Sequence, residues 1–265
     1  MASLELEARL DNLLSTAQKE TANIDLFAPM AENEECPICL IPLPLHDGEV
    51  VFMTCCGKQI CNGCTYKEVM NDMKNGLLES KCAFCRQPDR NEGKTNIKRI
   101  KKLMKKKNPE AFMQMAVYYK EGRNVIQSDT RALEMYICAA ELSHANAYVS
   151  IGEFYENGVV VEQNMSKALE CFELGAKKGS VHAHKVLSII HGRNGKHAKG
   201  IEHLTVAARS GAQDSMDYLM KVYKAKGVSK EDLAQILRAF QASNNVMKSK
   251  DRDDARAAVP ARSGS

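Results

Sequence analysis

The residues best suited to chemistry in this chain are its cysteines, and eight of the ten lie between positions 36 and 85. They form four close pairs, three with the CxxC spacing and one an adjacent doublet. The pairs are Cys36/Cys39, Cys55/Cys56, Cys61/Cys64 and Cys82/Cys85. A CxxC turn can direct two sulfurs at one ion, and two such turns supply the four thiolates that a structural zinc prefers. Four pairs therefore predict two zinc ions per chain, in preference to free thiols or redox chemistry.

The segment MTCCGKQICNGC leaves the identity of the eighth ligand open. Lys58 stands where a metal-binding protein would be expected to carry histidine, and a protonated ammonium is not a zinc ligand. Consecutive side chains diverge, so Cys55 and Cys56 can share one ion only if the backbone turns tightly, which Gly57 would assist. His46 is the reserve ligand.

This cysteine pattern resembles the RING finger, in which the first and third pairs hold one zinc and the second and fourth pairs hold the other. The resemblance implies that zinc 1 is bound by Cys36, Cys39, Cys61 and Cys64, and zinc 2 by Cys55, Cys56, Cys82 and Cys85. All-cysteine RING variants usually leave one residue inside the second pair, so the adjacent doublet departs from the family. Serial pairing, first with second and third with fourth, would instead indicate a tandem zinc ribbon or a treble clef, and the spacing does not exclude it.

The resemblance also implies a surface for a ubiquitin-charged E2 enzyme, whose thioester would react directly with a substrate lysine. The positions that contact E2 or ubiquitin in this family fall on Ile38, Arg86 and Pro88. An apolar segment between the third and fourth pairs supplies Val69, Met70, Met73, Leu77 and Leu78. The proline that usually follows the seventh ligand is replaced by Ala83. Simple packing is the alternative role for Ile38 and Pro88, and neutralisation of a zinc site is the alternative for Arg86.

Charge balance gives the basic residues of this region a second use. A zinc ion with four thiolates has a formal charge of −2, whereas the chain without metal has a formal charge of +4. We expect the field of the two sites to be offset by the nearby cations Lys58, Lys67, Lys81 and Arg86.

Beyond the cysteines the sequence repeats with an offset of 36 residues, which places Ala111 on Ala147 and Gly122 on Gly158. A third unit is shortened between its helices, and a fourth is weaker. Each unit predicts a helix, a glycine-containing loop and a second helix, and such pairs must stack to bury their apolar faces. Residues able to cap the second helices are Ser128, Asn164 and Ser229, the last with Asp232 in a capping-box pattern.

These units resemble Sel1-like repeats, a subclass of the tetratricopeptide-like α/α solenoids, which are generally scaffolds for protein partners. The sequence therefore predicts a mainly α protein, a small two-zinc RING module followed by an α/α solenoid. Its expected parts are an N-terminal amphipathic helix and linker (1–31), the RING-type zinc finger (32–90), a basic linker or helix (91–108), four repeats (109–144, 145–180, 181–212 and 213–243) and a disordered tail (244–265).

Three flanking features complete the prediction. The N-terminal helix carries one apolar stripe, formed by Leu6, Leu10, Leu13, Leu14 and Ala17. We expect it to pack on the neighbouring domain, with dimerisation as the alternative. The basic run at 94–109 is interpreted as a solvated helix, with nuclear localisation or nucleic-acid binding as the alternative. Cys138 and Cys171 occupy apolar helix positions and are expected to be buried without chemistry.

Composition restricts the function classes. The N-terminus has no pattern typical of a signal peptide, and no apolar run approaches the ~20 residues that span a bilayer, so we expect no membrane partner and a cytoplasmic or nuclear location. The leading hypothesis is a RING-type E3 ubiquitin ligase that binds an E2 through the zinc module and a protein substrate or adaptor through the solenoid. The alternatives are a non-enzymatic zinc-binding scaffold and, less favoured, a nucleic-acid-associated zinc protein.

Overall fold

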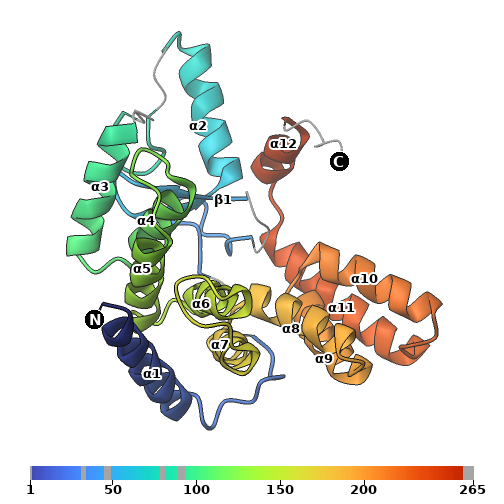
Figure 1. The fold of residues 1–265 in the computed structure, drawn as a ribbon. Helices are drawn as coiled ribbons and strands as arrows, with labels where there is room; N and C mark the ends of the chain where they lie inside the picture. The colour runs from blue at the N-terminus through green and yellow to red at the C-terminus, as the bar shows by residue number, and fades with distance from the viewer. Residues whose placement is uncertain (1, 31–33, 45–48, 78–80, 89–92, 259–265) are drawn as a thin grey trace.

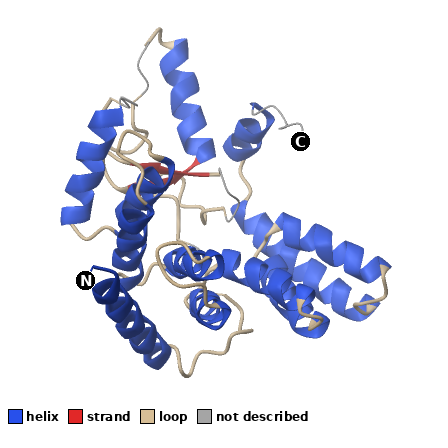
Figure 2. Ribbon diagram, viewed as in Figure 1, coloured by secondary structure: helices blue, strands red, loops and turns tan. Residues whose placement is uncertain are grey.

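Most of the chain is helical. The computed structural model describes residues 2–30, 34–44, 49–77, 81–88 and 93–258. Within these residues Figures 1 and 2 show helices throughout and one short two-stranded hairpin. Every helix in this part of the chain is too short or too polar to cross a lipid bilayer. The predicted mainly α fold is therefore confirmed.

Four antiparallel helix pairs form the solenoid. They are α4 (Pro109–Glu121), α5 (Asp129–Glu141), α6 (Ala145–Asn157), α7 (Met165–Lys177), α8 (Val181–Arg193), α9 (His197–Arg209), α10 (Gln213–Lys224) and α11 (Lys230–Met247). The second helix of one pair packs on the first helix of the next, which joins the pairs into one stack. The eight helices span residues 109–247, and α11 extends beyond residue 243, the expected end of the fourth repeat.

The predicted caps fix where the second helices begin. Ser128, Asn164 and Ser229 each accept a hydrogen bond from the backbone N–H three residues later, at 3.3, 3.0 and 3.0 Å. Ser229 also donates its hydroxyl to the carboxylate of Asp232, at 2.7 Å. Each cap satisfies a backbone donor that the helix itself cannot satisfy, which stabilises the helix by about 1 kcal/mol. The predicted capping residues are thus confirmed.

The N-terminal helix α1 (Ala2–Glu20) belongs to the solenoid core. It lies across α5 and α7, the second helices of the first two pairs (Figure 1). Its apolar stripe is buried in the same hydrophobic cluster as the repeats, and Leu10 is completely buried. A bidentate ion pair from Arg9 to Glu141, at 2.8 and 2.7 Å, holds its outer side. The stripe is therefore covered by the chain itself, as the packing interpretation predicts, rather than left open for dimerisation.

The segment after α1 continues along the same face of the solenoid. Phe27 packs on the ring of His203 in α9, with 4.9 Å between ring centroids. Met30 packs against Val181 and Ala207. Residues 2–30 thus lie mainly along the second helices of three successive pairs, and Met30 also reaches Val181 at the start of α8.

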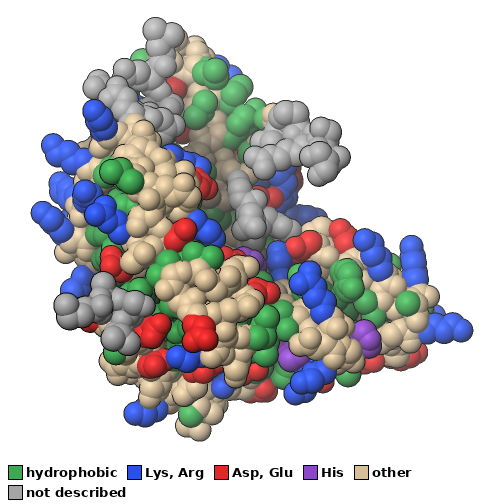
Figure 3. All heavy atoms as spheres, in the orientation of Figure 1, with side chains coloured by type: hydrophobic (Ala, Val, Ile, Leu, Met, Phe, Trp, Pro, Cys, Tyr) green, Lys and Arg blue, Asp and Glu red, His purple; other side chains and the backbone are tan. Residues whose placement is uncertain are grey.

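The basic helix α3 (Gly93–Lys105) joins the cysteine region to the solenoid. Its buried side, Ile100 and Leu103, packs against Ala111 and Met115 of α4 and against Phe52 of the hairpin. Its lysines lie on the outer side, where Figure 3 shows a concentration of Lys and Arg side chains. The expected solvated basic helix is present, and it is packed between two parts of the fold rather than being a free linker.

The C-terminal region differs from its prediction. The sequence predicts disorder over 244–265, whereas the structure has α11 reaching Met247 and a further helix, α12 (Lys250–Ala258). Helix α12 packs against α2 (Asn62–Lys74), which lies far from it in the sequence. Figure 1 shows α2 and α12 side by side. Helix α12 is ordered because Arg252 and Ala255 are buried against the cysteine region, a contact that local composition does not encode.

Candidate metal centre

The cysteine module (residues 34–88) is built around a short hairpin. Strands β1 (Val50–Met53) and β2 (Lys58–Cys61) are antiparallel, with Met53 paired to Lys58. The doublet lies in the turn between the strands, and α2 begins directly after Cys61. The hairpin and the start of α2 therefore bring the second and third cysteine pairs close to each other, while the first and fourth pairs arrive on separate loops.

Those two loops share one backbone design. Leu40 and Arg86 follow the second cysteine of their CxxC pairs and both have left-handed backbones, with φ of 56° and 61°. The N–H of Leu40 donates to the carbonyl of Cys36, and that of Arg86 donates to the carbonyl of Cys82, both at 2.9 Å. We call these CxxC loops the first knuckle (residues 35–42) and the second knuckle (residues 81–88). Each is closed by an isolated β-bridge to a proline, Glu35–Pro42 in the first and Lys81–Pro88 in the second. This turn directs both sulfurs of a CxxC pair to the same side.

The adjacent doublet is accommodated by a tight turn. The N–H groups of Cys56 and Gly57 both donate to the carbonyl of Met53, at 3.2 and 2.7 Å. Gly57 has φ of 73°, and a Cβ there would lie 2.8 Å from Leu103 Cδ2 of α3. Glycine is therefore favoured by the left-handed backbone, and it also leaves room for the Leu103 side chain of α3. The turn that Cys55 and Cys56 need in order to face one site is present.

The eight sulfurs gather into two quartets. The first consists of Cys36, Cys39, Cys61 and Cys64, and the second of Cys55, Cys56, Cys82 and Cys85, with the sulfurs of each quartet within 4.8 Å of one another. The first pair thus meets the third, and the second pair meets the fourth. This is the crosswise arrangement, and the described residues do not show the serial one. His46 lies outside the described residues.

The spacing of the sulfurs fits a tetrahedral zinc site. The nearest sulfurs are Cys36–Cys64 at 3.9 Å, Cys39–Cys61 at 3.8 Å, Cys56–Cys82 at 3.9 Å and Cys55–Cys85 at 3.4 Å. Four thiolates about 2.3 Å from a central zinc are about 3.8 Å apart at the edges of the tetrahedron. A disulfide would require about 2.05 Å, and all ten cysteines are free thiols. Each quartet could therefore hold one metal ion, and an all-sulfur donor set favours zinc.

The pKa values of the thiols also favour a bound cation in each quartet. Burial tends to raise the pKa of the Cys36 thiol, but three backbone N–H donors outweigh it and lower that pKa to about 7. A backbone N–H has the same net effect on the pKa of Cys85. Burial and neighbouring sulfurs raise the pKa of Cys64 and of Cys55 far above its usual range. Without a cation, each quartet cannot carry four thiolates, because their charges repel; a divalent ion would remove that cost.

The cation that touches sulfur is not among those expected from the sequence. The four expected counter-charges, Lys58, Lys67, Lys81 and Arg86, are exposed. Lys67 is paired with Asp251 at 2.9 Å, and Arg86 is paired with Glu68. Arg252 of α12 is instead completely buried, and its Nη2 lies 3.7 Å from the sulfur of Cys39. Its position in the sequence gives no signal of this contact, because Arg252 lies more than 150 residues after the last cysteine of the module.

The residues predicted to contact E2 lie at the surface of the module. Ile38 is 40% exposed in the first knuckle, and Arg86 and Pro88 are exposed in the second. On α2 and just beyond it, Val69, Met73 and Leu77 are exposed and Met70 is half-buried, whereas Leu78 lies outside the described residues. Figure 3 shows hydrophobic side chains along α2 at the surface.

Phe84 is a further surface residue that the sequence analysis did not single out. It is exposed between Cys82 and Cys85, with the Lys58 ammonium 6.0 Å from its ring centroid. It occupies the same place in the second knuckle as Ile38 does in the first. A repeated sequence pattern, ECPICLIP and KCAFCRQP, could have revealed this equivalence.

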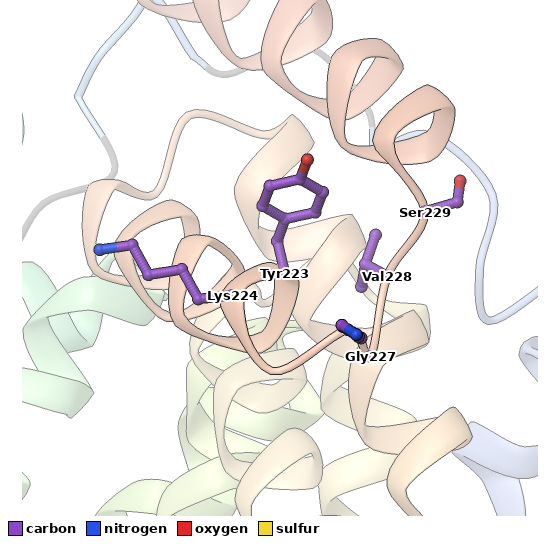
Figure 4. A pocket seen from close by; sticks show the side chains of 6 residues that line it. Tyr223, Lys224, Gly227, Val228 and Ser229 are labelled. Carbon is purple, nitrogen blue, oxygen red and sulfur yellow. The ribbon is translucent and has the colours of Figure 1, made fainter.

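Two hollows on the solenoid carry no comparable chemistry. One, of about 950 Å³, is lined mainly by apolar residues of α8, α9 and α10, including Ile189 and Tyr218. The other, of about 500 Å³, lies where α10 turns into α11. Figure 4 shows that Tyr223 and Lys224 point in different directions there, so no group of side chains converges as in an active site. Such surfaces suit binding rather than catalysis.

Comparison with known proteins agrees with the repeat assignment. The Sel1 repeat family model matches residues 109–144 and 145–180, the first two predicted units. These two Sel1 repeats are therefore confirmed, and they indicate a protein-interaction scaffold. No curated protein matches the chain.

Two solved structures are similar to part of this chain. A Sel1 repeat protein from Oxalobacter formigenes matches with 24% identity and a TM-score of 0.47, covering 74% of this chain and 72% of its own. The protein c5321, described as a protective antigen of uropathogenic Escherichia coli with an SLR fold, matches with 18% identity and a TM-score of 0.47. That match covers 68% of this chain and 37% of the antigen.

Proposed function

We propose that this chain is a RING-type E3 ubiquitin-protein ligase with two zinc ions, an E2-binding cysteine module and a partner-binding solenoid. The observation that carries the proposal is the crosswise gathering of the eight sulfurs into two quartets, with exposed apolar residues beside them. Ile38 and Pro88 would contact the E2, and Arg86 would contact E2 and ubiquitin. A zinc ion would supply structure only, by fixing the loops that carry these three residues.

The reaction proposed needs no nucleophile from this chain. In the described structure eight cysteines are gathered in the quartets, Cys171 is fully buried and Cys138 is half-buried. The amine of a substrate lysine would attack the ubiquitin thioester carried by the E2. The carbon–sulfur bond breaks, an amide bond forms and the E2 thiol is released. The contribution of this chain is to hold the two reactants together and to restrict the thioester to a reactive geometry.

The position of Arg86 supports this role and sets a condition on it. Its left-handed backbone is held by the bond to Cys82, so the side chain leaves the second knuckle in a fixed direction. Its guanidinium is paired with Glu68 of α2 in the free chain. Because the Arg86 side chain is largely exposed, this pair contributes little to stability and can be exchanged for acceptors on a partner.

The solenoid would bind the substrate or an adaptor on its open face. Residues 2–30 lie mainly along the second helices of the first three pairs and reach the first helices only where Met30 contacts the start of α8, while α3 packs on part of α4. Helix repeats present extended surfaces of this kind to protein partners. We therefore propose that the partner contacts the first helices of the repeats.

The deciding experiment is autoubiquitination of the full chain with a panel of E2 enzymes. Ile38→Ala and Arg86→Ala should each reduce product formation by about tenfold or more while zinc content stays at two per chain, because truncating a central contact residue costs over 1 kcal/mol. Val51→Ala and Arg123→Ala are matched controls, since both residues are exposed and neither is among the residues assigned to E2 or ubiquitin contact. Those controls should behave as the wild type.

The outcome separates the proposed ligase from its alternatives. A wild type that is inactive with every E2, and that binds none of them, is a zinc-binding interaction scaffold and not a ligase. Arg86→Ala activity equal to wild type would remove the role assigned to that residue. Binding of RNA or DNA that weakens steeply with salt would instead favour the nucleic-acid alternative, through the outward lysines of α3.

A further inference from the structure

The guanidinium of Arg252 is buried without a carboxylate. It is completely shielded from solvent, and within the described residues no Asp or Glu pairs with it. A buried cation without a counter-charge costs several kcal/mol, so buried arginines are almost always paired. Something of negative charge must therefore lie against this side chain.

The neighbours of Arg252 identify that counter-charge. Nη1 donates to the carbonyls of Pro42 and Met247, both at 2.8 Å, and Nη2 donates to the carbonyl of Ile41 at 3.2 Å. Nη2 also lies 3.7 Å from the sulfur of Cys39. Carbonyls orient the planar guanidinium but carry no net charge. The first quartet, with a divalent metal and four thiolates, would have a formal charge of −2 and would supply the negative charge that the described residues around Arg252 otherwise lack.

The surroundings of α12 are shaped to bring Arg252 to this place. Gly63, in the first turn of α2, has no side chain because a Cβ would lie 2.7 Å from the backbone nitrogen of Arg252. Lys67 pairs with Asp251 at 2.9 Å on one side of the helix. On another side Arg256 makes two bonds to Glu49, at 2.6 and 3.0 Å. A close backbone contact and two ion pairs thus orient the same short helix.

The second knuckle provides an internal comparison. Arg99 of α3 donates to the carbonyl of Pro88 at 3.1 Å, as Arg252 donates to the equivalent Pro42. Arg99, however, makes this bond at the surface, and among the described residues it touches no sulfur. Both knuckles are therefore approached by an arginine from a helix, the second by one from the next helix in the chain and the first by one from the far end of the chain, but among the described residues only Arg252 meets a quartet sulfur.

We propose that Arg252 is a positioning residue of the first metal centre, and that α12 thereby fastens the far end of the solenoid to the cysteine module. The guanidinium lies beside the Cys39 sulfur, where its charge favours a negatively charged quartet, and it orients the first knuckle through the carbonyls of Ile41 and Pro42. Outer-shell partners of this kind typically change metal affinity by about 10- to 100-fold. The inference rests on metal binding by the first quartet and is independent of ligase activity.

The test is the rate of zinc transfer from the full chain to a chromogenic chelator. Two phases are expected, and Cys85→Ser, which disables the second quartet, identifies the phase that belongs to the first. Arg252→Gln should speed that phase by about tenfold or more and leave the other phase unchanged. Arg252→Lys, which keeps the charge, should lie between Arg252→Gln and wild type. Arg99→Gln, the equivalent change at the second knuckle, should leave the phase of the first quartet at its wild-type rate.

A second measurement guards against loss of folding in the Arg252 variants. In the zinc-loaded wild type, hydrogen exchange in residues 250–258 should be slow, and removal of zinc should speed it while α5 and α7 keep their protection. Wild-type release from the first quartet in Arg252→Gln, or equal acceleration of both phases, would overturn the proposal. The same hydrogen-exchange rate in α12 with and without zinc would also overturn it. Chains that contain no zinc at all would instead refute the metal centre itself, which keeps the two failures distinguishable.

Discussion

A buried pair of histidines should make the solenoid sensitive to acid. His184 of α8 and His203 of α9 are each 1% exposed, and their Nδ1 atoms are 3.0 Å apart. That bond requires one neutral ring to donate and the other to accept, so two protonated rings cannot keep it. Phe27 and His191 also pack on the His203 ring, which is 1% exposed, so solvent cannot reach it to stabilise a second charge.

The size of the effect follows from the acidities. Burial lowers the pKa of His184 to about 4. Burial, together with repulsion from His184 and His191, lowers the pKa of His203 to about 3. The unfolded chain has its histidines near pKa 6.5 and therefore binds more protons below that pH, so stability is highest above pH 6.5 and is lost as pH falls. At about 1.36 kcal/mol per pH unit, each ring costs about 2 kcal/mol between pH 6.5 and pH 5, or about 4 kcal/mol for the pair.

Urea unfolding at pH 7 and pH 5, followed by helical circular dichroism, measures this cost. The double variant His184→Asn/His203→Asn should lose about 4 kcal/mol less than the wild type between the two pH values, whatever its stability at pH 7. His182→Asn, at an exposed position of α8, is the control and should keep the wild-type loss. The same loss in wild type and double variant would refute the reasoning. So would NMR titration of the two rings near pH 6.5 in the folded chain.

Two further predictions concern the cysteine module. Cys55→Ser and Cys56→Ser should each reduce zinc from two ions per chain to about one by elemental analysis, because the doublet faces one quartet; Cys138→Ser should retain two. Retention of two zinc ions by either doublet variant would remove that cysteine from the ligand set. Gly63→Ala should lower the melting temperature of the module, because overpacking against Arg252 costs about 1–3 kcal/mol, whereas Gly192→Ala, with open space around it, should be neutral or stabilising.

Sequence reasoning succeeded where the determining interactions are local. The N-caps at Ser128 and Asn164 and the stacked pairs follow from residues within one repeat, so a fixed offset of 36 positions carried the information. The cysteine pairs were equally visible, because a CxxC knuckle is a local turn. The crosswise grouping of the pairs came only from the family resemblance, since spacing alone allowed serial pairing as well.

It failed where a contact joins distant segments of polar sequence. The stretch around Arg252, KSKDRDDARAA, has no apolar stripe, and its composition is typical of disorder. Its order comes from one buried guanidinium and one buried alanine against the cysteine module. The expected counter-charges were basic residues close to the cysteines in the sequence. Arg252, whose guanidinium touches the Cys39 sulfur, is distant in the sequence and was therefore not among them.

The cysteine module is held from two opposite ends of the solenoid. At the start of the solenoid, Asn108 caps α4 and also donates its amide to the carbonyl of Gly57 in the doublet turn, at 3.2 Å. At the end, α12 carries Arg252 to the first quartet. The chain is therefore closed on itself through the module, and neither α3 nor α12 acts as a loose tether. If an E2 binds at Ile38 and a partner binds along α4, α6 and α8, their relative orientation is fixed by these two contacts. Only lysines at a suitable place on the partner would then reach the thioester, so the closure itself would contribute to substrate selection.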